Sequence, residues 1–161
     1  EAALVERVVG AVSELPESAR IADLYSGAGT FTFPMSKIAS VSAYDGDDAL
    51  MKALLQGARG AGLDGRVSAE ARHLGHRPLS TNVLSSFDAV VFDPPRPGAE
   101  IQVKELARSS VPLVVAVSCN PESFARDARI LIDGGYVLER VMPVDQFVWT
   151  RHLELVGVFR R

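Results

Sequence analysis

Apolar residues in this chain follow two spacings, one typical of helices and the other of buried strands. Residues 4–12 carry apolar side chains three and four positions apart, which predicts an amphipathic helix near the start. The nearly unbroken apolar runs Phe87–Phe92 and Val111–Ser118 instead indicate strands that are buried on both faces of a parallel sheet. Helical and strand-like segments alternate along most of the chain, and this order predicts an α/β fold.

The chain divides into seven expected strands and five expected helices. The strands are expected at Arg20–Tyr25, Val41–Asp45, Arg66–Glu70, Phe87–Phe92, Val111–Ser118, Tyr136–Val144 and His152–Phe159. The helices are expected at 4–12, Phe31–Ile38, Asp47–Ala61, Ile101–Ser109 and Phe124–Ile132, and a loop at His73–Ser86. Because no helix separates the last two strands, we predict a Rossmann-like, doubly wound and mostly parallel sheet with an antiparallel last strand.

Composition narrows the class of protein. The 161 residues are 47% hydrophobic and 23% charged, which suits a single domain, residues 1–161, and the net charge of −3 argues against strong nucleic-acid binding by these residues alone. The single cysteine excludes a disulfide framework and favours a reducing compartment such as the cytoplasm. No apolar stretch reaches the ~18 residues of a membrane span. The first residues, Glu-Ala-Ala-Leu, lack an initiator Met, so we expect a piece of a longer protein. We expect no metal.

The strongest chemical signal is Cys119, in the sequence V-S-C-N-P-E-S-F-A-R-D of residues 117–127. The apolar run before it predicts a strand, whereas Asn120, Pro121 and Glu122 are typical of the cap and first turn of a helix. The thiol is therefore expected between a strand and a helix N-terminus, where the helix dipole favours a thiolate nucleophile. The alternative is a buried and unreactive cysteine.

A glycine-rich turn follows the first expected strand, in the sequence D-L-Y-S-G-A-G-T-F of residues 23–31. Gly27 and Gly29 allow the backbone to approach a ligand closely, but Thr32 stands where a dinucleotide-binding motif needs a third glycine. Asp45, at the end of the next strand, could accept hydrogen bonds from both hydroxyls of a ribose. This combination favours S-adenosylmethionine over NAD or FAD. The alternative for Asp45 is a helix-capping role.

Two further acids carry candidate chemistry. Asp93 ends a buried strand, and the prolines that follow it stiffen a turn that is typical of a site for a base or a cofactor, or of a turn with no ligand. Glu154 lies in the last expected strand, where alternation places it on the same face as His152. It is either an exposed acid on an edge strand or a buried acid suited to proton transfer.

Four motifs, taken in order along the chain, resemble those of the catalytic domain of the RNA 5-methyluridine methyltransferase family. They are D-L-Y-S-G-A-G-T-F, D-P-P-R, S-C-N-P-x-x-x-A-R-D and D-Q-F…H-L-E. These enzymes use S-adenosylmethionine to methylate carbon 5 of a uracil in ribosomal or transfer RNA. The resemblance extends from about Arg20 to Phe159, and S-C-N-P-x-x-x-A-R-D is its most specific element. It implies RNA as the partner, with 23S rRNA favoured over tRNA. The family's N-terminal RNA-binding regions have no counterpart in these residues, so the chain resembles an isolated catalytic domain.

The resemblance also implies roles for single residues. Cys119 corresponds to the family's nucleophile and Glu154 to its general base. The positions that hold the cofactor, including the glycine turn, correspond to Tyr25, Gly27, Gly29, Thr30, Asp45 and Asp93. His73 stands where an Asp or Asn contacts the adenine in other members. Attack by the thiolate on carbon 6 would activate carbon 5 for methylation, and the base would then remove the carbon 5 proton.

Two other functions stay open. The Asp-Pro-Pro sequence is also similar to a motif of amino-group methyltransferases that act on adenine or on protein glutamine. Those enzymes have an aromatic residue after the prolines, where this chain has Arg96. The second alternative is a cofactor-binding domain without catalysis. Phe124, Phe147 and Trp149 are either stacking partners for an unpaired base or parts of the core.

Overall fold

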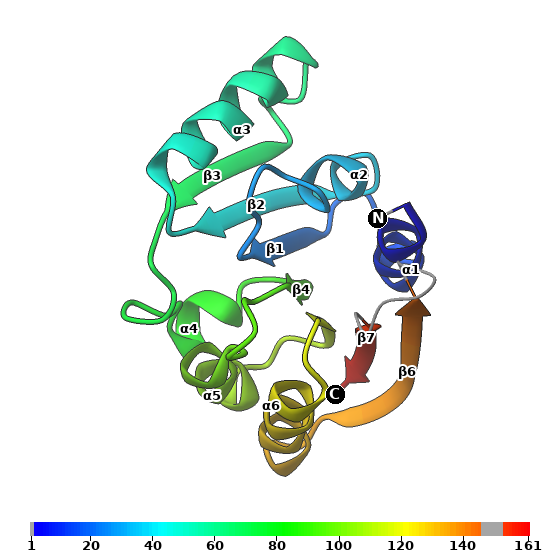
Figure 1. Cartoon of the computed structure of the whole chain (residues 1–161). Coiled ribbons are helices and arrows are strands. Elements are labelled where there is room, and N and C mark those ends of the chain that lie inside the picture. Colours follow the sequence, from blue (N-terminus) through cyan, green and yellow to red (C-terminus); the bar gives the residue numbers. More distant parts are fainter. Residues whose placement is uncertain (1, 146–152) are drawn as a thin grey trace.

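A computed structural model describes residues 2–145 and 153–161, which form one seven-stranded sheet covered by helices (Figure 1). The helices are α1 (Ala2–Val12), α2 (Thr32–Ser36), α3 (Asp48–Gly60), α4 (Thr81–Leu84), α5 (Glu100–Arg108) and α6 (Pro121–Asp133). The strands are β1 (Arg20–Leu24), β2 (Ser40–Asp45), β3 (Val67–Ala71), β4 (Ala89–Phe92), β5 (Leu113–Ser118), β6 (Val137–Asp145) and β7 (Leu153–Arg160).

The strand order is β3-β2-β1-β4-β5-β7-β6. The first five strands pair in parallel, and β7 runs antiparallel to both of its neighbours, β5 and β6. The predicted mostly parallel sheet with an antiparallel last strand is therefore confirmed. Because β7 lies between two strands, the edge-strand alternative for Glu154 is wrong.

Helices cover both faces of the sheet, as the continuous apolar runs in the central strands require. Alternate residues of β1 show the two layers, since Ile21 packs in the core under α1 and α2, whereas Ala22 packs in the core under α4, α5 and α6. Met51 of α3 extends the first layer over β2 and β3. Figure 1 shows α1, α2 and α3 on one side of the sheet and α4, α5 and α6 on the other. The fold is thus doubly wound, as predicted.

One predicted loop contains a helix. Within His73–Ser86, the short helix α4 starts after Ser80, whose hydroxyl accepts a hydrogen bond from the Val83 N–H at 3.4 Å. Its first residue, Thr81, donates from its N–H and its hydroxyl to the Glu105 carboxylate of α5 at 2.9 and 2.8 Å. The prediction failed because this helix depends on a contact with a residue far along the chain.

The predicted connection between the last two strands, residues 145–151, lies outside the described part of the chain except for Asp145, which ends β6. Among the described helices, none has the length and apolar character needed to cross a bilayer.

Candidate functional site

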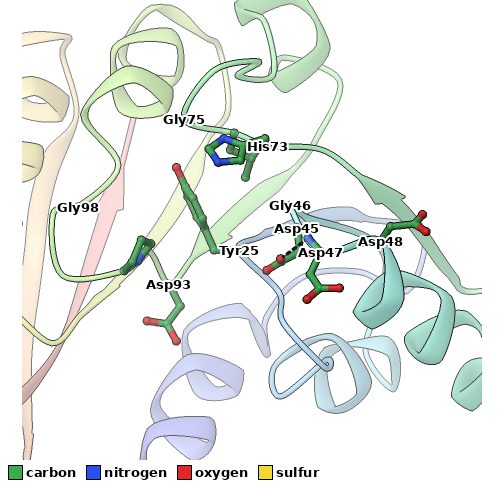
Figure 2. Close-up of a pocket in the computed structure, with 11 residues that line it drawn as sticks. Tyr25, Asp45, Gly46, Asp47, Asp48, His73, Gly75, Asp93 and Gly98 are labelled. Atoms are coloured by element: carbon green, nitrogen blue, oxygen red, sulfur yellow. Dashed lines mark hydrogen bonds between the residues drawn. The ribbon is translucent and has the colours of Figure 1, made fainter.

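A cavity of about 740 Å³ lies at the carboxyl ends of β1, β2 and β4. The residues that line it are Tyr25, Asp45, Gly46, Asp47, Asp48, His73, Leu74, Gly75, Asp93, Pro95 and Gly98. The strand order reverses between β1 and β4, and open α/β sheets bind their ligands at such a reversal. In Figure 2, Asp93 and Gly98 lie on one side of Tyr25, and Asp45 to Asp48 lie on the other. The cavity therefore has the position and size of a small-molecule site.

The turn after β1 is built by unusual backbone angles. Gly27 and Gly29 have φ values of +53° and +96°, and a Cβ on Gly29 would lie 2.8 Å from the Phe33 ring. Tyr25, at φ +60°, is the one non-glycine with positive φ among the described residues, and such strain costs ~1–3 kcal/mol and clusters at functional sites. Gly27, Gly29 and the exposed Thr30 lie in the turn itself rather than in the cavity lining, to which Tyr25 belongs.

Asp45 holds this turn in place. One of its carboxylate oxygens accepts from the Gly27 N–H at 3.0 Å, and the other accepts from the Asp47 N–H at 3.0 Å. The cap of α3 is Asp47, whose side chain accepts from the N–H groups of Ala49 and Leu50, so the helix-capping alternative for Asp45 is wrong. A carboxylate offers about four lone-pair sites, and each oxygen of Asp45 therefore keeps one for a ligand hydroxyl.

Two buried acids lie at the same edge of the sheet. Burial raises the pKa of Asp23 to about 7, despite the hydroxyl of Thr32 that donates to its Oδ2 at 2.5 Å. Its Oδ1 has no hydrogen-bond partner among the described residues. Burial and the nearby charge of Glu154 raise the pKa of Asp93 to about 6. Asp93 thus lines the cavity and also lies close enough to Glu154 for the two carboxylates to interact electrostatically.

Cys119 and Glu154 occupy neighbouring positions at the edge of two adjacent strands. Ser118 pairs with Leu155 in the antiparallel β5–β7 ladder. One position further toward the same edge of the sheet, the chain that leaves β5 has Cys119 and β7 has Glu154. Cys119 is partly exposed, so the alternative of a buried cysteine is wrong, and Glu154 is partly buried. Neither residue lines the 740 Å³ cavity, so nucleophile and base candidates lie beside it. A partly accessible thiol next to a carboxylate can perform nucleophilic attack followed by proton removal.

The helix that follows Cys119 begins as predicted. The side chain of Asn120 accepts from the Glu122 N–H at 3.1 Å, and Pro121 occupies the first helical position. This cap fixes the thiol at the N-terminus of α6. The arrangement could be predicted because capping is a local interaction between neighbouring residues.

The remaining predicted site residues have mixed positions. His73 lines the cavity, and its ring stacks on that of His76 with centroids 4.4 Å apart. Phe124 is buried, with its ring 6.5 Å from the Phe159 ring, so its role is core packing. Phe147, Trp149 and His152 lie outside the described residues.

Several cavity residues were not among the candidates named from the sequence. Gly46, Asp47, Asp48, Leu74, Gly75 and Gly98 line the cavity without having been predicted to do so, whereas Pro95 belongs to the predicted Asp-Pro-Pro turn. Each follows the end of a parallel strand, and that position is the one feature that could have identified them.

The chain is similar to RNA methyltransferases. A family model described as tRNA (uracil-5-)-methyltransferase matches residues 75–161, more than half of the chain. A protein of Caulobacter vibrioides, called an uncharacterized RNA methyltransferase, is 50% identical over 161 residues, which are 100% of this chain and 38% of the relative. The 23S rRNA (uracil(1939)-C(5))-methyltransferase RlmD of Alteromonas naphthalenivorans is 36% identical over 143 residues, which are 88% of this chain and 30% of the relative.

A solved structure supports the same relationship. The crystal structure of Pyrococcus abyssi tRNA (uracil-54, C5)-methyltransferase in complex with S-adenosyl-L-homocysteine matches with a TM-score of 0.80 and 34% identity, over 97% of this chain and 38% of that one. The chain thus spans less than two fifths of the length of each of these relatives. The resemblance drawn from the motifs is confirmed, and the chain belongs to the tRNA (uracil-5-)-methyltransferase family.

Proposed function

We propose that this chain catalyses S-adenosylmethionine-dependent methylation of carbon 5 of a uridine in RNA, through a covalent bond between Cys119 and the uracil. The observation that supports this most is the β5–β7 register, which brings the strand ends that carry Cys119 and Glu154 together. Both groups then lie at the carboxyl edge of the parallel strands, next to the cavity that Asp93 lines. We infer that the 161 residues act as a single catalytic domain.

The cavity suits S-adenosylmethionine, which supplies a methyl group on an electrophilic sulfonium. Its lining includes the acids Asp45, Asp47, Asp48 and Asp93, which favour a cationic ligand and disfavour a phosphate. The free lone pairs of Asp45 suit ribose hydroxyls. The S-adenosyl-L-homocysteine bound to the Pyrococcus abyssi relative supports this assignment.

Each catalytic candidate has a defined step. The Cys119 sulfur attacks carbon 6 of the uracil, and the electron pair of the 5,6 double bond moves to form an enolate, which makes carbon 5 nucleophilic. Carbon 5 takes the methyl group as the S–CH3 bond of the sulfonium breaks and its electron pair stays on sulfur, so carbon 5 then carries both a methyl group and a proton. Glu154 removes that proton, the 5,6 double bond forms again, and the Cys119 sulfur leaves. Asp93 and the Pro94–Pro95 turn position the uracil ring and the cofactor.

RNA that contains 5-fluorouridine tests this function. Fluorine at carbon 5 cannot be removed as a proton, so the reaction stops after methyl transfer and leaves RNA joined to Cys119. We expect a slow-migrating, cofactor-dependent band on a denaturing gel, and no such band with the Cys119→Ser variant. An amino-group methyltransferase or a non-catalytic domain would give no band with either protein.

For the target, we propose 23S rRNA and cytoplasmic action. The similarity to the RlmD protein of Alteromonas naphthalenivorans supports a ribosomal target, whereas the similarity to the Pyrococcus abyssi enzyme supports transfer RNA as the competing target. A partly exposed cysteine that must stay reduced fits the cytoplasm. Incubating the full-length protein with total RNA and labelled cofactor, then mapping the labelled nucleotide, separates the two targets. Label in tRNA alone would exclude the ribosomal one.

A further inference from the structure

The loop between β4 and α5, residues 93–99, is held by three hydrogen bonds from α6 and its cap. The Asn120 side-chain amide donates to the carbonyl of Arg96 at 3.2 Å. The Arg126 guanidinium donates to the carbonyl of Pro97 at 2.8 Å, and the Ala99 N–H donates to the Asp127 carboxylate at 2.7 Å. Three of the four residues from Arg96 to Ala99 are therefore bound to α6 or to its cap.

The ion pair in this set is partly buried and well satisfied. The side chain of Asp127 is 5% exposed, and its Oδ1 accepts from Nε and Nη2 of Arg126 at 3.0 and 2.7 Å. Its Oδ2 accepts from the loop, and Nη1 of Arg126 lies 3.7 Å from the Glu100 carboxylate. Charge-assisted bonds of this kind are about twice as strong as neutral ones and set a fixed geometry.

Gly98 lets the loop lie directly on the Arg126–Asp127 pair. Its φ is +82°, and a Cβ at this position would lie 2.5 Å from Nη2 of Arg126 and 2.7 Å from Oδ2 of Asp127. The Gly98 N–H donates to the carbonyl of Pro95 at 2.8 Å, which closes the turn after Asp93. The loop therefore has no room to move toward α6.

We propose that Arg126 and Asp127 are positioning residues that hold the loop carrying Asp93 in a fixed relation to Cys119. Helix α6 connects the two, because it starts two residues after Cys119 and also holds the loop through Arg126 and Asp127. This inference rests on the proposed function, in which both ends of the connection take part. A shift of about 1 Å in a reacting group can cost ~10²-fold in rate.

The test compares Arg126→Ala with Arg129→Ala in the full-length protein. Arg129 is the matched control, because it lies on the same helix, is exposed, and pairs with Asp133 at 3.7 Å. For Arg126→Ala we expect kcat to fall ~10- to 100-fold because the loop shifts relative to the thiol, and KM for the cofactor to rise by a smaller factor, because only part of the cavity lining lies on this loop. Amide hydrogen exchange at Ala99 should rise at least ~10-fold as its bond to Asp127 weakens. Arg129→Ala should match the wild type in all three measurements.

Arg126→Lys guards against a variant that fails to fold. Lysine keeps the charge and can donate to the Pro97 carbonyl, but it cannot form the forked contact with Asp127, so kcat and Ala99 exchange should fall between those of the wild type and Arg126→Ala. Unchanged kcat or unchanged exchange in both variants would overturn the positioning role. A higher KM for RNA with normal kcat would make Arg126 an RNA contact instead. If the wild type methylates no RNA, the proposed function and the positioning role both fail, while the exchange data still decide whether the pair orders the loop.

Discussion

At the scale of single residues, Cys119 is the group on which the proposed reaction depends most. Its sulfur is partly exposed at the end of β5, beside the strand end that carries Glu154. A serine hydroxyl has nearly the same size but is a far weaker nucleophile than a thiolate. The contacts that shape the cavity do not involve this side chain.

We therefore predict that Cys119→Ser lowers methyl transfer by ~10³-fold or more, as loss of a catalytic nucleophile does in other enzymes. Cofactor affinity should stay within ~2-fold of the wild type, because the cavity lining is unchanged. Labelled methyl incorporation into RNA and titration calorimetry measure the two effects. Substantial turnover by the variant would point to chemistry that needs no nucleophile.

Glu154 gives a second prediction at this scale. Glu154→Gln keeps the shape of the side chain but cannot accept the carbon 5 proton, so attack and methylation proceed and elimination stops. Protein joined to methylated RNA should accumulate and appear as a retarded band on a denaturing gel. The double variant Glu154→Gln, Cys119→Ser is the control and should show no band. Normal turnover without a trapped species would leave Asp93 as the next candidate base.

At the scale of elements, the turn after β1 and the start of α3 depend on Asp45. Its two oxygens accept from the N–H groups of Gly27 and Asp47, so one side chain fixes both segments and faces the cavity. The sequence offered a ribose contact or a helix cap for Asp45 and did not predict that it holds the turn after β1. If Asp45 also binds the ribose, as proposed, one carboxylate couples the position of the turn to ligand binding.

Asp45→Ala should weaken S-adenosylmethionine binding ~10- to 100-fold, since it removes about two charge-assisted hydrogen bonds to the ligand and loosens the turn. Asp45→Asn should have a smaller effect because its amide still offers an acceptor oxygen. Asp64→Ala, which changes an exposed acid outside the cavity, is the control. Calorimetry with each variant measures the affinity, and equal affinities for Asp45→Ala and the wild type would remove Asp45 from the site.

At the scale of the whole molecule, buried acids make stability depend on pH. The folded state raises the pKa of Asp93 to about 6 and that of Asp23 to about 7, both from 3.8. The folded protein therefore holds these protons more tightly than the unfolded chain. Their contribution to stability is complete below about pH 4 and is lost as the pH rises through about 6 and 7.

Asp23→Asn should remove the larger part of this dependence. Because the side chain is fully buried, we expect the variant to have a higher free energy of unfolding than the wild type at pH 8, by on the order of 4 kcal/mol, with the gain nearly absent at pH 4. Urea unfolding of both proteins without cofactor at pH 4, 6 and 8 measures it. Asp64→Asn is the exposed control and should show no such trend. A gain that does not change with pH would contradict a raised pKa of Asp23 in the folded protein.

The sequence by itself determined which segments form strands and helices, because periodicity and capping are signals between neighbouring residues. It also placed the candidate residues Cys119, Asp45, Asp93 and Glu154 in or directly after strands, and the structure confirms those positions. Its exceptions were local conformations that need a distant partner, such as α4, which depends on Glu105 of α5.

Only the tertiary structure decided how these residues combine. Placing β7 between β5 and β6 brings the ends that carry Cys119 and Glu154 together, although 34 residues lie between them in the sequence. It also set the Arg126–Asp127 pair against the loop after Asp93. The physical reason is that strand order and register are fixed by packing many apolar side chains at once, and no short segment carries that information.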